Sequence, residues 1–298
     1  MKKYADMTAE ECAKYYARTY WKTIIIYTCI LIFFGAIFIA EDMYIDILNY
    51  GNDAAQELYI GLNRVFWFYF IVFAILCAII FCVIVTVKSI SFKEIYLILG
   101  DSEKYIEAEE LVKKKIPFFR ADGRRKCIIA NAYLALGDYD NAWKWYEKII
   151  PKKISKCHNI YNMFGLACYF FAVKNYEEAE KYLARLEKLK ATVVIQRLNL
   201  KVMIAYLKSI YAIREGRYED AKKLINRDID NGIFTNQMTC YNLKAQCNYN
   251  LACCAYENGD YIEAIIRYRA AVACGGKLSI VDKAKEKLEE LEAKIIKD

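Results

Sequence analysis

The sequence predicts an all-α chain, with two membrane-spanning helices in its N-terminal part and an array of helix pairs after them. Three observations predict this class. Two long runs carry no charged residue, a tyrosine–alanine motif recurs along the rest of the chain, and only two prolines and twelve glycines interrupt 298 residues. No stretch stands out for the apolar–polar alternation of a strand, so we expect helices throughout.

The first element is a short polar segment, residues 1–22, expected on the cytoplasmic side. Thr8 followed by Glu11 is typical of a helix start, because each side chain can cap a backbone N–H of the other. Residues 23–40 then form a run of eighteen residues without a charge. As a helix this run would extend about 27 Å, close to the hydrocarbon thickness of about 30 Å.

Residues 65–87 form a second uncharged run of twenty-three residues, long enough to cross a bilayer with some tilt. A signal peptide would have a shorter apolar core and small residues before a cleavage point, which the first run lacks. A soluble helical domain seldom needs two such blocks. We therefore interpret 23–40 and 65–87 as transmembrane helices.

Charges beside the two spans predict their orientation. Five lysines and arginines precede the first span, and Lys88 and Lys93 follow the second. Residues 41–64 carry five acids against Arg64 alone. Because basic flanks stay in the cytoplasm, 41–64 should be an extracytoplasmic loop. We expect an integral membrane protein of a bacterial plasma membrane with both termini cytoplasmic.

A Tyr-x-x-Ala motif recurs five times after the second span. Its alanines lie 34, 37, 42 and 43 residues apart, at Ala108, Ala142, Ala179, Ala221 and Ala264. A turn dipeptide precedes each of the last four copies: Gly137-Asp138, Lys174-Asn175, Gly216-Arg217 and Gly259-Asp260. A small residue stands twelve positions before each of those alanines, at Ala130, Ala167, Ser209 and Ala252. This agreement predicts repeated helix-turn-helix units whose helices cross at the small residues.

The clearest copy is NYNLACCAYENGDYIEAIIRYRAAV, residues 248–272, and it resembles a tetratricopeptide repeat, a helix-turn-helix unit of about 34 residues. The resemblance implies an α-solenoid over residues 88–278, with about five repeats of which the first is divergent. Residues 279–298 would form a capping helix, because their single apolar stripe can cover the open end of an array. The spacings above 34 imply longer helices or loops at 186–201 and 227–244.

In this family the first helix of each unit lines a concave face that binds peptides. Carried over by alignment, the resemblance implies a protein-binding groove made of Asn131, Leu134, Tyr161, Phe164, Phe171, Met203, Tyr206, Tyr249, Asn250 and Tyr256. Apolar residues replace the basic side chains with which some family members hold a peptide carboxylate. We therefore expect an apolar or amphipathic protein or peptide partner. Alternatively, these side chains pack on one another.

Residues that could support catalysis are few. The single histidine, His158, adjoins Cys157, and side chains of neighbouring residues seldom face each other as a nucleophile and its base must. The twelve cysteines lack the paired spacing of a zinc site, and cysteine is a frequent small filler between helices. We expect no enzyme activity, no metal and no cofactor.

Basic charge is concentrated in the units that follow the second span. Anionic lipid is one expected partner of this cluster, near Lys113, Lys114, Lys115, Arg124 and Arg125. Nucleic acid is not expected, because no groove-reading motif accompanies the charge. The sequence thus predicts a membrane-anchored scaffold that binds or assembles protein partners at the cytoplasmic face. The alternative is an accessory subunit of a membrane enzyme or transport complex, which an ionisable residue within a span would favour.

Overall fold

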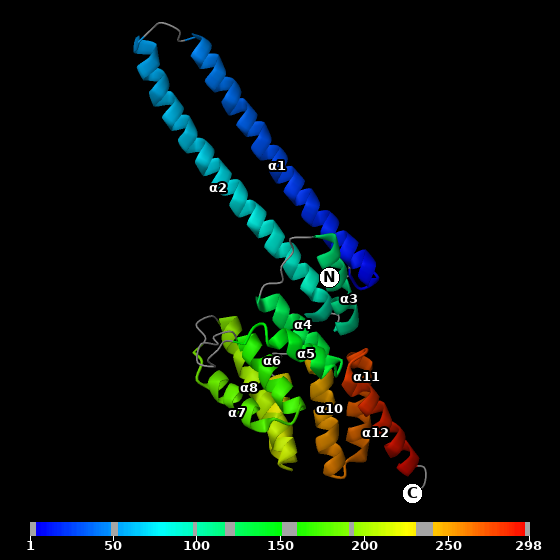
Figure 1. Cartoon of the computed structure of the whole chain (residues 1–298). Coiled ribbons are helices and arrows are strands. Elements are labelled where there is room, and N and C mark those ends of the chain that lie inside the picture. Colours follow the sequence, from blue (N-terminus) through cyan, green and yellow to red (C-terminus); the bar gives the residue numbers. More distant parts are fainter. Residues whose placement is uncertain are drawn as a thin grey trace. The chain divides into compact units, whose positions relative to one another are not determined.

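The computed structural model describes seven stretches of the chain: residues 4–48, 53–97, 100–116, 123–150, 160–190, 194–230 and 241–295. These stretches form twelve α-helices and contain no β-strand, which confirms the all-α prediction (Figure 1). The chain divides into a hairpin unit, Glu11–Phe92, and a helix-pair unit, Met1–Glu10 with Lys93–Asp298.

The hairpin unit contains most of two long helices, α1 (Ala9–Leu48) and α2 (Asp53–Leu97). The helices are antiparallel, because residues further along α1 contact residues further back in α2. The ring centroids of Tyr27 and Phe81 lie 5.2 Å apart, and those of Phe34 and Phe73 lie 4.4 Å apart. Aromatic contacts therefore join the middle parts of the two helices, which form a hairpin (Figure 1).

Both helices are apolar enough to cross a membrane. The apolar stretches are Ala9–Ile37, with a mean hydropathy of 1.8, and Trp67–Ile84, with a mean hydropathy of 2.9. Each stretch contains an apolar window of eighteen residues of which none is buried inside the protein, in contrast to the core helix of a soluble domain. Large side chains such as Ile32 and Phe68 are instead exposed, as a hydrocarbon environment would require.

The helices extend beyond the predicted spans. The polar segment and the first span form one helix, since α1 begins at Ala9 and continues to Leu48. The connection predicted at 41–64 is mostly helical, because α2 already begins at Asp53. No glycine or proline stands between Gly35 and Gly51 to end the first helix, which explains its length.

The helix-pair unit contains the remaining helices. Their bounds are α3 (Ser102–Lys115), α4 (Gly123–Ala135), α5 (Tyr139–Tyr146), α6 (Ile160–Ala172), α7 (Tyr176–Glu187), α8 (Val194–Arg214), α9 (Tyr218–Asp230), α10 (Tyr241–Glu257), α11 (Tyr261–Gly275) and α12 (Ser279–Ile295). Helices α4–α5, α6–α7, α8–α9 and α10–α11 pack as consecutive pairs, and α12 packs on α11. The long spacing before the fourth motif is explained by α8, which begins within the predicted segment 186–201.

The four pairs share one turn. Two positions after the first helix of each pair, the backbone has a positive φ, at Gly137 (79°), Lys174 (62°), Gly216 (74°) and Gly259 (78°). The next residue donates its backbone N–H to the carbonyl five positions earlier, at 2.8–3.0 Å in all four turns. This is the Schellman ending of a helix, which glycine favours because it has no Cβ.

The residue that follows each positive-φ residue also caps the start of the second helix in three of the four pairs. Asp138, Asn175 and Asp260 each accept a hydrogen bond from the backbone N–H three residues on, at 3.1, 3.3 and 3.1 Å. Asp101 caps α3 in the same way. Arg217 occupies this place before α9 and pairs instead with the carboxylates of neighbouring residues. One short turn therefore ends one helix and starts the next.

Small residues lie where the paired helices cross. The alanine of each Tyr-x-x-Ala motif is at most 1% exposed, as are the small residues twelve positions earlier: Ala108, Ala142, Ala179, Ala221, Ala264, Ala130, Ala167, Ser209 and Ala252. A larger side chain at these places would push the helices apart, which explains why the motif uses alanine.

The first and last parts of the helix-pair unit touch. Ala135 at the end of α4 packs with Ala245 of α10 and with Leu278 and Val281 near the start of α12. Lys277 also forms an ion pair with Glu103 of α3. In addition, α4 contacts α6, α6 contacts α8 and α8 contacts α10, so the first helices of successive pairs adjoin one another.

Candidate binding surfaces

The ten predicted groove residues lie on the first helices of four successive pairs, α4, α6, α8 and α10. Met203 and Tyr206 are buried, at 9% exposure each, and the other eight are half-buried. The structure therefore brings the predicted residues onto adjoining helices. Most of them make contacts inside the protein.

Tyr206 joins three of these helices. Its ring lies 5.9 Å from that of Phe164 on α6, in an edge-to-face arrangement. Its hydroxyl donates a hydrogen bond to Oε1 of Gln246 on α10, at 2.8 Å. Burial raises the pKa of Tyr206 well above its ordinary value, so the hydroxyl stays protonated. This side chain is part of the core.

The other aromatic side chains are also engaged. The ring of Phe171 lies 5.1 Å from that of Tyr211, and the ring of Tyr249 lies 5.6 Å from that of Tyr268. These contacts join α6 to α8 and α10 to α11. Tyr256 donates a hydrogen bond to Glu290 of α12, at 3.2 Å.

The polar members of the predicted groove hold helices together. Asn131 accepts a hydrogen bond from the hydroxyl of Tyr146, which lies on α5 and is fully buried. Tyr161 accepts one from Nδ2 of Asn199 on α8, at 2.9 Å. Leu134 packs against the main core. These residues therefore make contacts inside the protein.

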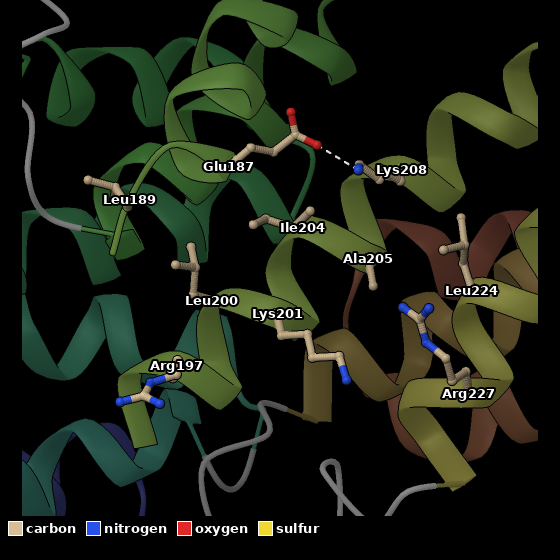
Figure 2. A pocket seen from close by; sticks show the side chains of 10 residues that line it. All are labelled: Glu187, Leu189, Arg197, Leu200, Lys201, Ile204, Ala205, Lys208, Leu224 and Arg227. Carbon is tan, nitrogen blue, oxygen red and sulfur yellow. Dashed lines mark ion pairs between the residues drawn. The ribbon is translucent and has the colours of Figure 1, made fainter. Parts of the chain in front are cut away.

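A pocket of about 340 Å³ lies elsewhere on the helix-pair unit, between the end of α7, one side of α8 and α9 (Figure 2). Its lining is Glu187, Leu189, Arg197, Leu200, Lys201, Ile204, Ala205, Lys208, Leu224 and Arg227. Half of these residues are apolar, four are cations and one is a carboxylate. We call it the α8 pocket.

The α8 pocket and the predicted groove residues lie on different sides of α8. One row, spaced four, three and four residues apart, is Arg197, Lys201, Ile204 and Lys208. A second row with the same spacing, two residues further on, is Asn199, Met203, Tyr206 and Ile210. At about 100° per residue the rows are about 160° apart, so they face nearly opposite directions.

The charge of the α8 pocket is mainly positive. Nζ of Lys208 lies 2.6 Å from a carboxylate oxygen of Glu187, as Figure 2 shows. The lining contains four cations and one carboxylate, which gives its residues a net charge of +3. The sequence contains the signal for this site, a basic row at helical spacing. It was missed because residues 186–201 were assigned to a longer helix or a loop.

The basic cluster predicted to meet lipid is smaller than expected. Lys113, Lys114 and Lys115 are exposed in the last turn of α3, where cations also complement the helix dipole. The side chain of Arg124 lies outside the described residues. Arg125 is buried, at 3% exposure, so including it in a lipid-facing cluster was wrong.

Arg125 is buried because it faces α3. Its Nε lies 2.6 Å from Oε1 of Glu109, which also accepts a hydrogen bond from the hydroxyl of Tyr105 at 2.6 Å. Burial and the adjacent carboxylate raise the pKa of Tyr105 well above its ordinary value. The three side chains form a buried polar link between α3 and α4.

Six cysteines of the helix-pair unit lie among the described residues, and all are buried or half-buried: Cys127, Cys168, Cys247, Cys253, Cys254 and Cys274. Burial raises the pKa of Cys247 to about 12 and that of Cys254 to about 12, so both stay as unreactive thiols at neutral pH. Among the described residues, no group of three or more His, Cys, Asp or Glu side chains is placed to hold a metal ion. His158 lies outside the residues that the structure describes.

No protein-family model and no curated protein matches this chain. The resemblance to tetratricopeptide repeats therefore depends on the repeated residues, turns and caps of the chain itself.

Proposed function

We propose that this protein is a membrane-anchored scaffold of tetratricopeptide-like helix pairs that binds a protein partner beside the membrane, with no catalysis of its own. The observation that carries the proposal is the fourfold repetition of one helix-turn-helix unit in a chain with two apolar helices. Such stacked helix pairs present extended surfaces that suit protein recognition.

The repeated turn supports the assignment of the helix pairs to this type. Four turns share a positive φ and the same backbone hydrogen bond, and three of them share the same side-chain cap. The buried alanines fall in register with these turns. Contacts between successive first helices support a stacked array of pairs, and the packing of Ala135 with Ala245, Leu278 and Val281 joins α4 to the last helices.

The proposed orientation has both termini in the cytoplasm of a bacterial cell and the connection between α1 and α2 outside. Its support is the excess of lysine and arginine before α1 and after the second uncharged run, against the acids in 41–64. A cysteine placed at Asn52, in a background without accessible native thiols, should react with an impermeant maleimide on intact cells. Protection of that position, together with labelling of a C-terminal cysteine, would reverse the orientation.

Photo-crosslinking in native membranes tests the binding function. A photoreactive residue is placed at three exposed positions of the helix-pair unit, Lys201, Lys223 and Lys283, and at Ile32 on the hairpin. The proposal expects a discrete protein adduct from at least one of the three lysine positions. Adducts from Ile32 alone would favour the alternative, an accessory subunit held through its spans. Absence of any protein adduct would remove the scaffold function.

A further inference from the structure

We propose that α11 binds a second copy of this chain through an exposed apolar stripe, in an antiparallel contact about a two-fold axis. The stripe consists of Ile262, Ile266, Ala270 and Ala273, at spacings of four, four and three residues. We call it the α11 stripe. The inference goes beyond the proposed function, because it concerns a contact between two copies rather than the binding of another protein.

The α11 stripe is open to solvent. Ile262 is 73% exposed and Ile266 is 55% exposed, and Ala273 is exposed further along the same face. Among the described residues that follow the hairpin unit, the two isoleucines are the most exposed large apolar side chains. Side chains three and four residues apart are neighbours on a helix surface. Adjoining exposed apolar side chains, unlike single ones, indicate a contact surface.

The other three pairs carry charged residues where α11 carries the stripe. One and five residues after the motif tyrosine, their second helices have an acid and a lysine, all six of them exposed: Asp140 and Lys144, Glu177 and Lys181, Glu219 and Lys223. Nine residues after that tyrosine they have a basic residue: Lys148, Arg185 and Arg227. The helix pair therefore folds without apolar residues at these positions, so the α11 stripe has a role other than folding.

The order of large and small side chains along the stripe favours a second copy. Two isoleucines form its first half, and two alanines form its second half. When two stripes meet antiparallel, Ile262 faces Ala273 of the other copy and Ile266 faces its Ala270, about one two-fold axis. Each large side chain then fills the space beside a small one. A parallel contact would place alanine against alanine and leave that half poorly packed.

The arginines beside the stripe are balanced within each copy. Nε of Arg267 lies 2.7 Å from a carboxylate oxygen of Glu263. A guanidinium nitrogen of Arg269 lies 2.8 Å from a carboxylate oxygen of Glu292 on α12. Two copies can therefore approach with little repulsion between these arginines. Antiparallel helices also bring opposite ends of their dipoles together.

The size of the stripe predicts a weak contact that membrane anchoring strengthens. Helix α11 has 15 residues, which is about 22 Å at 1.5 Å per residue. A stable complex in solution buries about 800 Å² on each partner, which is more than four side chains on one helix face supply. Two copies anchored in one bilayer by the proposed spans need less affinity, because anchoring raises their effective concentration. We therefore expect pairs in membranes and single copies in dilute detergent.

Energy transfer between donor-labelled and acceptor-labelled copies of the full-length protein in phosphatidylcholine vesicles tests this inference. We expect transfer that decreases as lipid dilutes the protein. The variant Ile262→Glu with Ile266→Lys gives α11 the acid and lysine of the other three pairs. It should weaken association about tenfold or more, because two apolar side chains lose their contact. Its urea midpoint should match the wild type, since both positions are exposed. Glu177→Gln with Lys181→Gln, at the equivalent positions of α7, should leave association unchanged.

Cysteine crosslinking tests the antiparallel register. In a background without accessible native thiols, vesicles receive copies with Ile262→Cys, copies with Ala273→Cys, or a mixture of the two. We expect the mixture to form more disulfide-linked dimer on oxidation than either population alone. Equal or greater crosslinking by the Ile262→Cys population alone would refute the proposed register.

Two results would overturn the inference as a whole: no energy transfer at any ratio of protein to lipid, or equal transfer by wild type and the Ile262→Glu, Ile266→Lys variant. If that variant loses the protein adducts formed from Lys223 or Lys283, the stripe receives another protein and the inference fails. Loss of energy transfer with those adducts retained supports the inference and leaves the scaffold function intact. A dye at Ile266→Cys that reports an apolar environment in vesicles with a single copy would mean that the stripe lies in lipid, against the inference.

Discussion

Replacing Gly165 with alanine tests a close packing contact between two helix pairs. Gly165 lies on α6, and a Cβ built there would overlap Oδ1 of Asn131 on α4 and lie 2.7 Å from the hydroxyl of Tyr146 on α5. Real Cβ atoms essentially never approach other atoms this closely, so α6 or the two side chains would have to move. Tyr146 is fully buried, so its hydroxyl has no access to water as a substitute partner.

Opposing contributions determine the expected change in the free energy of unfolding. Alanine is the better helix former by about 1 kcal/mol, which stabilises the variant. Overpacking costs about 1–3 kcal/mol, and separating the Tyr146 hydroxyl from Asn131 leaves a buried polar group unsatisfied, at a further cost of about 1–3 kcal/mol. We therefore expect Gly165→Ala to destabilise the helix-pair unit by roughly 1–5 kcal/mol.

Urea unfolding of the full chain in detergent, followed by circular dichroism, measures this change. The ring of Trp143 on α5 stacks on Tyr169 of α6 at 5.3 Å, so this contact contributes to the change in tryptophan fluorescence on unfolding. Gly123→Ala is the matched control, because a Cβ at Gly123 would meet no atom within 4 Å. Adding Tyr146→Phe should reduce the cost of the alanine. A Gly165→Ala variant as stable as the wild type would refute the packing argument.

Three further changes test the turns and the buried thiols. Lys174→Gly should stabilise the unit by about 0.5–1 kcal/mol. The change removes the strain of a left-handed non-glycine residue, and this gain exceeds the extra backbone entropy that glycine loses on folding. An unchanged or lower urea midpoint would contradict this. Asp138→Ala should lower the free energy of unfolding by about 1 kcal/mol, because α5 loses its N-terminal cap. Arg217→Asn should raise the urea midpoint, because asparagine can supply the cap that α9 lacks. Equal midpoints for wild type and Arg217→Asn would contradict that extension. Cys247 keeps its proton in the folded state, since burial raises its pKa from 9.0 to about 12. Its contribution to stability is complete below pH 9 and is lost as pH rises toward 12. Iodoacetamide at pH 8.5 should therefore modify Cys247 rapidly only in urea, as mass spectrometry can show, and rapid native modification would disagree.

Local features of the chain could be predicted because they depend on neighbouring residues alone. Uncharged runs identified the two apolar helices, since hydropathy and length need no tertiary information. Glycine followed by Asp marked two of the four turns, because one residue can adopt a positive φ and the next can cap a helix. The burial of Ala142 and Ala264 followed from their position after those turns.

Features that depend on distant contacts could not be predicted in this way. The sequence by itself determined the helices, their turns and the residues at which paired helices cross. Only the tertiary structure decided that Ala135 meets Leu278, that Arg125 is buried against Glu109, and that Phe164 packs against Tyr206. Each pair is rotated slightly relative to the pair before it, and these rotations add up along the chain. A local sequence pattern does not predict the total rotation. The same rotations decide which side of α8 is covered and which side keeps an open basic pocket.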